Sequence, residues 1–249
     1  GGGDPLPGVE ESLFKLSQMS ESDIESCGRS LRSSSESAAS MEDCAGKVVG
    51  YLYDSLVHDR YHAKACALVR FYKTHAYADL DGESRDFAKR LLGGTLDKDD
   101  MRCLTLLSTI GENPEWNDRR NSTGHRAIPL PNESFMERIP MIWRMVSQLG
   151  INTSQIIRPD PVEVAETYDV FYVDEAVGSP YIPAQEDFVI PYGVRSVLGF
   201  GGLLSSGDLF VVILFAKVSV SLSVAQRFSP LALDVRAAVE DFVNGPIYA

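Results

Sequence analysis

The sequence predicts an α+β fold, because amphipathic helical patterns at both ends of the chain flank a strand-rich middle. Apolar residues recur at steps of three and four in residues 34–58, and again in residues 223–242. Between them lie several short, apolar, β-prone runs, and the last two are separated by the turn-like stretch SSGD. Two such runs joined by a short turn are typical of a β-hairpin.

The composition is that of a globular protein with a strong net negative charge. Of the 249 residues, 44% are hydrophobic, and the formal net charge is −12. Nucleic acids and anionic membranes are bound through clustered Lys and Arg, so we expect neither as a partner. No apolar run approaches the roughly 20 residues of a membrane span. The four cysteines form no CxxC pair, which favours a reducing, cytoplasmic compartment.

We divide the chain at residue 34. Residues 1–33 comprise a Gly-Gly-Gly tag remnant and a polar segment with weak helical periodicity. Nine serines fall between Ser20 and Ser40, and serine favours caps and turns, so this part is interpreted as a linker between short helices. Residues 34–249 then form a single domain with its flanking helices, and the first of these is expected to run for about 25 residues.

The middle of the chain mixes strands with helices. Residues 81–92 are interpreted as a helix closed by two glycines, and residues 131–150 as a helix split at Pro140. Residues 113–130 form a polar loop, and residues 184–193 a short helix or turn. The runs predicted to be strands are residues 65–75, 101–112 and 168–176.

Residues 195–218 contain four glycines in nine positions, GFGGLLSSG, which is the composition of a phosphate-binding loop. Gly202 and Gly207 have the spacing of a P-loop, but Asp208 follows where lysine is required. Leu204 occupies the third glycine position of a dinucleotide-binding turn. The apolar run that follows indicates a buried strand. We therefore predict a hairpin whose first-strand glycines mark a bulge, or the close approach of another backbone or a ligand.

The last predicted helix carries a heptad seam, with apolar residues at alternating steps of four and three. Pro230 either kinks this helix or occupies its first turn. The seam requires a partner, which is its own sheet, the other terminal helix or a second copy of the chain. The seam residues are Val224, Phe228, Leu231, Val235, Ala238 and Phe242.

The loop at residues 113–126 concentrates cationic and aromatic side chains in an otherwise acidic protein. It contains Trp116, Arg119, Arg120, His125 and Arg126. Two interpretations remain open: a site for an anion or a partner, or a surface loop with local salt bridges. The sequence contains no nucleophile elbow and no evident Cys–His pairing. It indicates no metal site and no particular cofactor, and we expect no catalytic activity from this chain alone.

Two long stretches, residues 102–132 and 178–218, resemble the GAF-like input regions that precede bacterial sensor histidine kinases and nucleotide cyclases. The resemblance covers residues 40–243. It implies an antiparallel sheet with helices on both faces and a small-molecule pocket on one face. It also implies a homodimer formed through the terminal helices, and an output domain after Ala249. The cyclic-nucleotide and bilin signatures of such domains are absent, so no ligand class carries over.

The expected function is therefore that of a cytoplasmic signal-input domain of a two-component histidine kinase or similar protein. Two alternatives stay open: an enzyme acting on a small anionic substrate, and a ligand-free dimerisation scaffold. A pocket is expected between the sheet and residues 113–190. Its candidate lining residues are Trp116, His125, Arg126, Tyr172, Tyr181 and Phe188.

Overall fold

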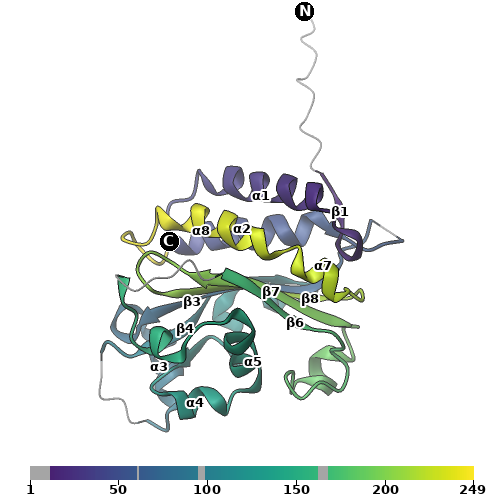
Figure 1. Cartoon of the computed structure of the whole chain (residues 1–249). Coiled ribbons are helices and arrows are strands. Elements are labelled where there is room, and N and C mark those ends of the chain that lie inside the picture. The colour runs from purple at the N-terminus through teal and green to yellow at the C-terminus, as the bar shows by residue number, and fades with distance from the viewer. Residues whose placement is uncertain (1–11, 61, 95–98, 162–167) are drawn as a thin grey trace, which may run out of the picture.

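A six-stranded antiparallel sheet forms the centre of the computed structural model, which describes residues 12–60, 62–94, 99–161 and 168–249 (Figure 1). The strand order is β5-β4-β3-β8-β7-β6. The strands are β3 (Cys66–Ala76), β4 (Arg102–Gly111), β5 (Ala127–Pro129), β6 (Tyr168–Val173), β7 (Ser196–Leu203) and β8 (Leu209–Ala216). The α+β class is confirmed, and so are the predicted strands. Residues 1–3, interpreted as a tag remnant, lie outside the described residues.

Both faces of the sheet are covered by helices, since its central strand β8 is apolar on both sides. Val212 and Leu214 join the core beneath one helical layer, and Val211 and Ile213 join the core on the other face. Every residue of β8 is buried. A strand that alternates apolar side chains toward two cores needs a cover on each side, as the sequence predicted.

Helices α2 (Met41–Ser55) and α8 (Ser229–Glu240) lie on the first face of the sheet, and α1 (Glu21–Ser35) packs over them as an outer layer (Figure 1). The division at residue 34 falls inside α1. The helix of about 25 residues expected from residue 34 was wrong: it is the end of α1 followed by the separate 15-residue α2. Serine side chains cause the break, because Ser40 accepts a hydrogen bond from the Asp43 amide and caps α2.

Helices α1 and α8 approach each other closely. A Cβ atom on Gly28 would lie 2.1 Å from Asp234 Oδ2, so a larger residue there would displace the Asp234 side chain. The Arg32 Nε atom lies 2.6 Å from Asp234 Oδ1, and Arg227 donates a hydrogen bond to the Met19 carbonyl. The N-terminal helix is therefore joined to the C-terminal helix rather than detached as a linker.

The heptad seam packs within its own chain. Five of its six residues are buried in the core between the helices and the sheet, and Phe242 is partly buried there. Pro230 lies in the first turn of α8 and separates it from the short helix α7 (Leu222–Gln226). Of the partners that the sequence left open, the seam uses its own sheet and α1.

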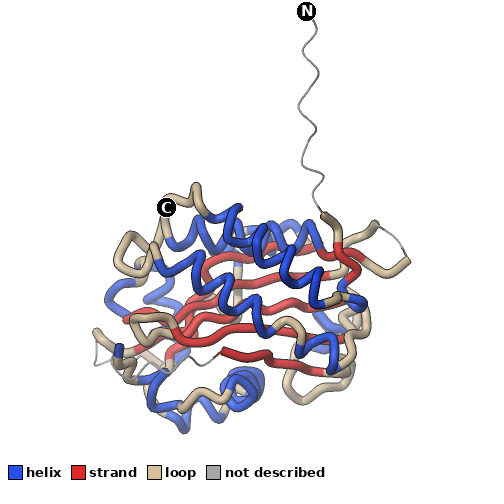
Figure 2. The backbone as a smooth tube through the Cα atoms, turned by 45° about the horizontal axis from the view of Figure 1, so that its top comes forward, coloured by secondary structure: helices blue, strands red, loops and turns tan. Residues whose placement is uncertain are grey.

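The second face is covered by shorter helices and turns (Figure 2). Helix α5 (Pro140–Leu149) begins at the predicted break, and its C-cap Gly150 has a φ of +68°, which favours glycine. The remaining elements of this layer are α4 (Glu133–Glu137), α6 (Thr153–Ile157) and a π-helical turn (Gln185–Val189). Helix α3 (Gly82–Leu91) packs near β5 with a small core of its own.

The glycine-rich stretch is strand β7 and its turn to β8, as predicted. A Cβ atom on Gly201 would lie 2.1 Å from the Phe210 carbonyl oxygen and 2.9 Å from Val211 Cα. At Gly199 the nearest atom would be Phe171 Cδ1, at 2.8 Å. These glycines therefore admit the neighbouring strands β8 and β6, whereas Gly207, with φ of +86°, makes the turn.

We expect Gly201→Ala to lower the free energy of unfolding by roughly 3 kcal/mol, because the new methyl group can be accommodated only by moving the backbone of β8. Urea denaturation measures the change. Gly50→Ala is the control: Gly50 lies within α2 with no atom near its Cβ position, so alanine should raise stability by about 0.5–1 kcal/mol. Equal stability of the two variants would contradict this account of Gly201.

Candidate functional site

Two of the predicted pocket residues meet in an aromatic cluster under the sheet. Trp116 contacts Phe188 edge to face, with ring centroids 5.4 Å apart, and lies 4.4 Å from the ring of Tyr192. Phe188 in turn contacts Phe215 of β8 at 5.1 Å. Asn113 donates a hydrogen bond to the Tyr192 hydroxyl. These rings pack against one another and fill the space between the sheet and the π-helical turn.

The two predicted tyrosines lie apart from this cluster. Tyr172 belongs to the core on the opposite face, where its hydroxyl donates to the Val220 carbonyl. Burial, followed by Asp174, raises its pKa to about 12. Tyr181 stacks under the guanidinium of Arg144, at 4.8 Å. The Gln185 side chain holds the segment around Tyr181 in a tight connection between β6 and β7. It accepts a hydrogen bond from the Gly178 amide and donates to the carbonyls of Ala176 and Ile182.

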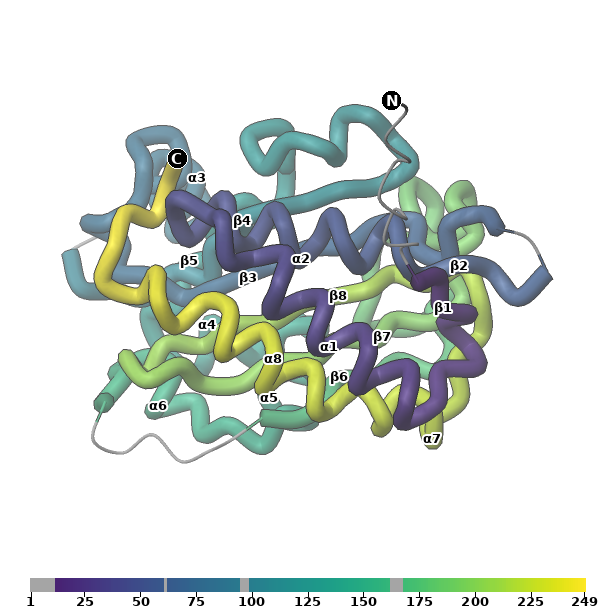
Figure 3. The backbone as a smooth tube through the Cα atoms, turned by 90° about the horizontal axis from the view of Figure 1, so that it is seen from above, coloured from purple at the N-terminus to yellow at the C-terminus, as the bar shows by residue number. Residues whose placement is uncertain are grey.

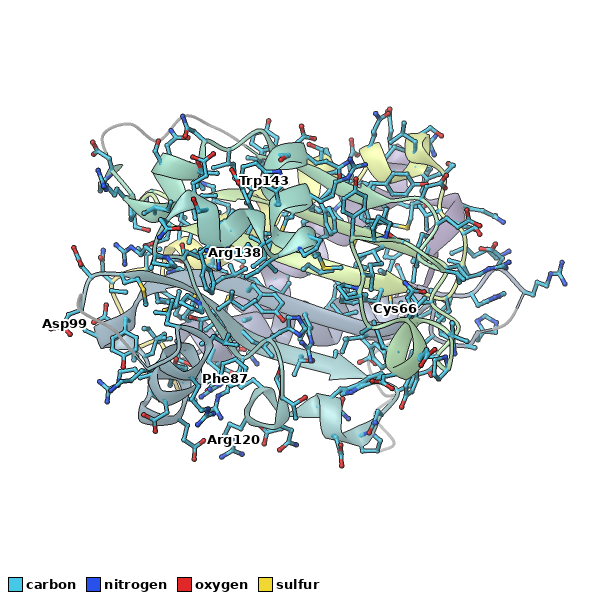
Figure 4. All side chains as sticks on the ribbon, turned by 90° about the horizontal axis from the view of Figure 1, so that it is seen from below. Cys66, Phe87, Asp99, Arg120, Arg138 and Trp143 are labelled. Carbon is cyan, nitrogen blue, oxygen red and sulfur yellow. The ribbon has the colours of Figure 1, made fainter. Side chains whose placement is uncertain are left out.

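Arg126 and His125 form no site with the aromatic residues. Arg126 is buried and donates to the hydroxyl of Ser84 at 3.1 Å and to the carboxylate of Glu83 at 3.0 Å, both at the start of α3. It fastens the 113–126 loop to that helix. His125 is exposed. Figure 4 views this face and shows Arg120 beside Phe87 of α3, away from Trp143 of α5.

The structure instead gathers charged residues around Arg119. Its Nε atom pairs with the carboxylate of Glu42 at the start of α2, and its Nη2 lies 2.9 Å from Asp81 Oδ2. Its guanidinium also lies 4.4 Å from the ring of Tyr248. Although burial opposes its charge, the two carboxylates raise the pKa of Arg119. Of the two interpretations of the loop, local salt bridges are observed at Arg119, Arg120 and Arg126.

A cavity of about 510 Å³ lies beside Arg119. It is bounded by β4, the start of α2, the 113–126 loop and the C-terminal residues. Strand β5 pairs only with residues 103–105 of β4, so the cavity lies beside the part of β4 that β5 leaves unpaired. Sequence reasoning missed most of its lining, since these residues are far apart in the chain and match no motif. The lining residues are Glu42, Leu107, Ser108, Thr109, Asn117, Asp118, Arg119, Arg120, Tyr248 and Ala249.

The C-terminal residues form one wall of this cavity. The amides of Met41 and Glu42 donate to the carbonyls of Pro246 and Ile247, at 3.1 and 2.7 Å. Figure 3 shows the C-terminus beside the junction of α1 and α2. We call residues 246–249 the tail. The first turn of α2 and Arg119 hold the tail against the domain.

A second polar cluster surrounds Asp208, in the turn between β7 and β8. The Lys73 ammonium is buried 4.0 Å from Asp208 Oδ2 and 3.3 Å from His75 Nδ1, and Arg102 lies 3.6 Å from Asp208 Oδ1. Burial lowers the pKa of Lys73 to about 8 against the opposing effect of Asp208. Burial and the charge of Lys73 also lower the pKa of His75. Asp208, which stands where a P-loop requires lysine, is thus the carboxylate partner of Lys73 and Arg102.

Other chemistry is limited in the part of the chain that the structure describes. No group of three or more His, Cys, Asp or Glu residues there could hold a metal ion. No helix there is both long and apolar enough to cross a membrane. The four cysteines are free and buried, and burial raises the pKa of Cys66 to about 12, so its thiol is a packing group.

No protein-family model matches the chain, and no curated protein resembles it in sequence.

We expect Lys73 to make the protein more stable as pH rises from 8 toward 10.5. In that window the folded chain has released a proton that unfolded Lys73, with its ordinary pKa of 10.5, still holds. Relative to Lys73→Met, the free energy of unfolding of the wild type should therefore rise by about 2 kcal/mol between pH 7.5 and 9.5.

Denaturation at several pH values measures that difference. Lys64→Met is the control, because Lys64 is an exposed partner of Asp54 and its removal should leave the pH dependence unchanged. A constant difference between the wild type and Lys73→Met across this window would show that Lys73 keeps its proton when folded.

Proposed function

We propose that this chain is the cytoplasmic, GAF-like signal-input domain of a bacterial sensor histidine kinase or similar signalling protein. In this proposal an output domain follows Ala249, and the domain controls it by holding or releasing the tail. The six-stranded antiparallel sheet with helices on both faces agrees with this class of domain. The GAF-like resemblance of residues 102–132 and 178–218 is the other support.

The docked tail is the observation on which the proposal depends. Residues 246–249 contact the first turn of α2 and line the cavity beside Arg119. Here the tail contributes Tyr248 to the cavity wall, and Arg119 joins that wall to Glu42 and Asp81. A change of contacts in the cavity would therefore change how firmly the tail is held. In this proposal the tail is the element with two states, held and released, whose balance a ligand biases.

The enzyme alternative has less support. An anionic substrate would have to bind Arg119, Arg120 or Arg126, and each of these guanidiniums pairs with a carboxylate of the same chain. Attraction to a further anion is weakened wherever the cation is already neutralised. The described part of the chain thus offers no unpaired arginine cluster in this loop for such a substrate.

We expect Arg119→Ala to free the tail. Hydrogen exchange should become at least tenfold faster at the amides of Met41 and Glu42, because their acceptors are tail carbonyls that Arg119 helps to hold. Arg138→Ala is the matched control, since Arg138 is exposed at the C-terminal cap of α4. In the natural gene product, Arg119→Ala should change output activity and Arg138→Ala should not. Faster exchange without any change in output would contradict the proposed function.

The proposal also includes a homodimer. Its interface would involve the outer faces of α1 and α8, because the heptad seam is already buried within the chain. Light scattering at tens of micromolar should give twice the chain mass of 27.3 kDa. A monomer at that concentration would remove the dimer from the proposal and leave the tail as the route of control.

A further inference from the structure

Arg70, in strand β3, is a half-buried cation without a carboxylate partner. Among the described residues, no Asp or Glu forms an ion pair with its guanidinium, whereas Arg119, Arg120 and Arg126 each pair with a carboxylate. The chain has no shortage of acids, with 35 acidic and 23 basic residues. Arginine is seldom withdrawn from water unpaired, because partial burial of a charge costs free energy. Arg70 therefore carries a positive charge that the described part of the chain leaves uncompensated.

The four nearest positions around Arg70 on the sheet are neutral. Thr109 of β4 and Ile213 of β8 lie directly opposite it on the two flanking strands. Leu68 and Tyr72 flank it along β3 and belong to the core of the second face, so the Arg70 side chain is on that face. A sheet usually compensates an arginine with an opposite charge on a neighbouring strand. Here any compensation has to come from outside the sheet.

One nitrogen of the Arg70 guanidinium is free to donate. Its Nη1 donates to the Tyr72 hydroxyl at 3.0 Å, and its Nε is enclosed without a partner. Its Nη2 has no partner among the described residues and is not enclosed, so it keeps contact with solvent. Because the guanidinium is planar, fixing Nη1 also sets the direction of Nη2. Nη2 is therefore an accessible donor that a ligand would not have to order.

His125 supplies a second accessible donor near Arg70. Desolvation, followed by the charge of Arg70, lowers the pKa of its imidazole from the ordinary 6.5. The ring is therefore neutral at pH 7 and carries one N–H donor. His125 is exposed, and within the described residues it hydrogen-bonds only through its backbone amide, to Ser122. The imidazole is thus available to a ligand that Arg70 attracts.

The charge at this place fits a monoanion. One guanidinium and one neutral imidazole give a single positive charge. A carboxylate brings a single negative charge and two acceptor oxygens, one for Arg70 Nη2 and one for the His125 ring. Sulfate brings a second negative charge, which would stay uncompensated in a chain of net charge −12. A neutral molecule would leave the guanidinium as it is.

We propose that Arg70 and His125 bind the carboxylate of a small organic acid on the second face of the sheet, the face that Figure 4 views. Arg70 Nη2 and the His125 ring donate to its oxygens. His125 belongs to the same 113–126 loop as Arg119, so a bound acid would steady the loop that holds the tail. That signalling consequence rests on the proposed function, whereas the binding itself does not.

Titration of the whole chain at pH 7, followed through the imidazole NMR signals of His125, tests the binding. The probes are acetate, butyrate and benzoate, with neutral acetamide and sulfate for comparison. We expect at least one acid to shift these signals with a Kd below about 5 mM, and both comparison probes to bind at least about fivefold more weakly. Absence of a saturable shift for all three acids, or binding of acetamide or sulfate as tight as that of the acids, would overturn the proposal.

Two variants place the acid, with its own NMR signals as the measurement. Arg70→Met removes the cation and keeps the apolar stem, so it should weaken binding at least about tenfold. Its Tm should stay unchanged or rise, because an unpaired charge is lost. His125→Ala removes a neutral donor at an exposed position, so this variant should fold and bind about fivefold more weakly. An unchanged Kd in either folded variant would overturn the proposal.

Arg144→Met is the matched control. Arg144 is likewise half-buried with an unpartnered Nε, but it lies on α5 with its guanidinium over the ring of Tyr181. This variant should keep the Kd of the wild type. A loss of affinity equal to that of Arg70→Met would show that binding does not depend on Arg70 in particular, and would also overturn the proposal.

Hydrogen exchange with the bound acid separates the two proposals. Slower exchange at the amides of Met41 and Glu42 would support both the acid site and the held tail. Binding with unchanged exchange would support the acid site and contradict the proposed function. Failure to bind would overturn the acid site whatever Arg119→Ala does to the tail.

Discussion

The fold depends on the central strand β8, which is apolar on both faces. Val211 and Val212 point toward different cores, and each core requires a helical cover. The cover on one face is drawn from both ends of the chain, because α2 and α8 lie on the sheet and α1 packs over them. This brings the N-terminal helix, the C-terminal helix and the tail together at one side of the sheet. The close crossing at Gly28 and the docked tail are consequences of that shared cover.

Charge is the second constraint, because an acidic chain has carboxylates within reach of each arginine in the 113–126 loop. Arg119 and Arg126 therefore fasten the loop to α2 and α3 instead of presenting a cationic surface. The same pairing leaves one guanidinium nitrogen of Arg119 without a partner beside a cavity. Lys73 shows the opposite compromise: Asp208 stabilises its charge, yet burial lowers its pKa to about 8. Buried ion pairs thus fix the structure at two edges of the sheet, around Arg119 and around Lys73.

Several features followed from local sequence. The predicted strands, the break at Pro140 and the hairpin turn depend on periodicity, on a missing amide and on a positive φ at Gly207, all of which act over a few residues. The helix expected from residue 34 was wrong because a cap hydrogen bond at Ser40 outweighed a continuous apolar stripe. The glycines of β7 were correctly linked to a close approach, but only the structure identifies the neighbouring backbone and side chains.

The sequence by itself determined the α+β class, the order of its main strands and helices, and the hairpin at residues 195–218, since short-range periodicity and motif spacing carry that information. Tertiary structure alone decided what lies beside what. It separated Tyr172 from Trp116 by a sheet, because alternate residues of a strand face opposite sides and the core of each side must be known. It also brought Glu42, Thr109, Arg119 and the tail around one cavity. Residues so distant in the chain share no local pattern, and only the packing of helices on the sheet joins them.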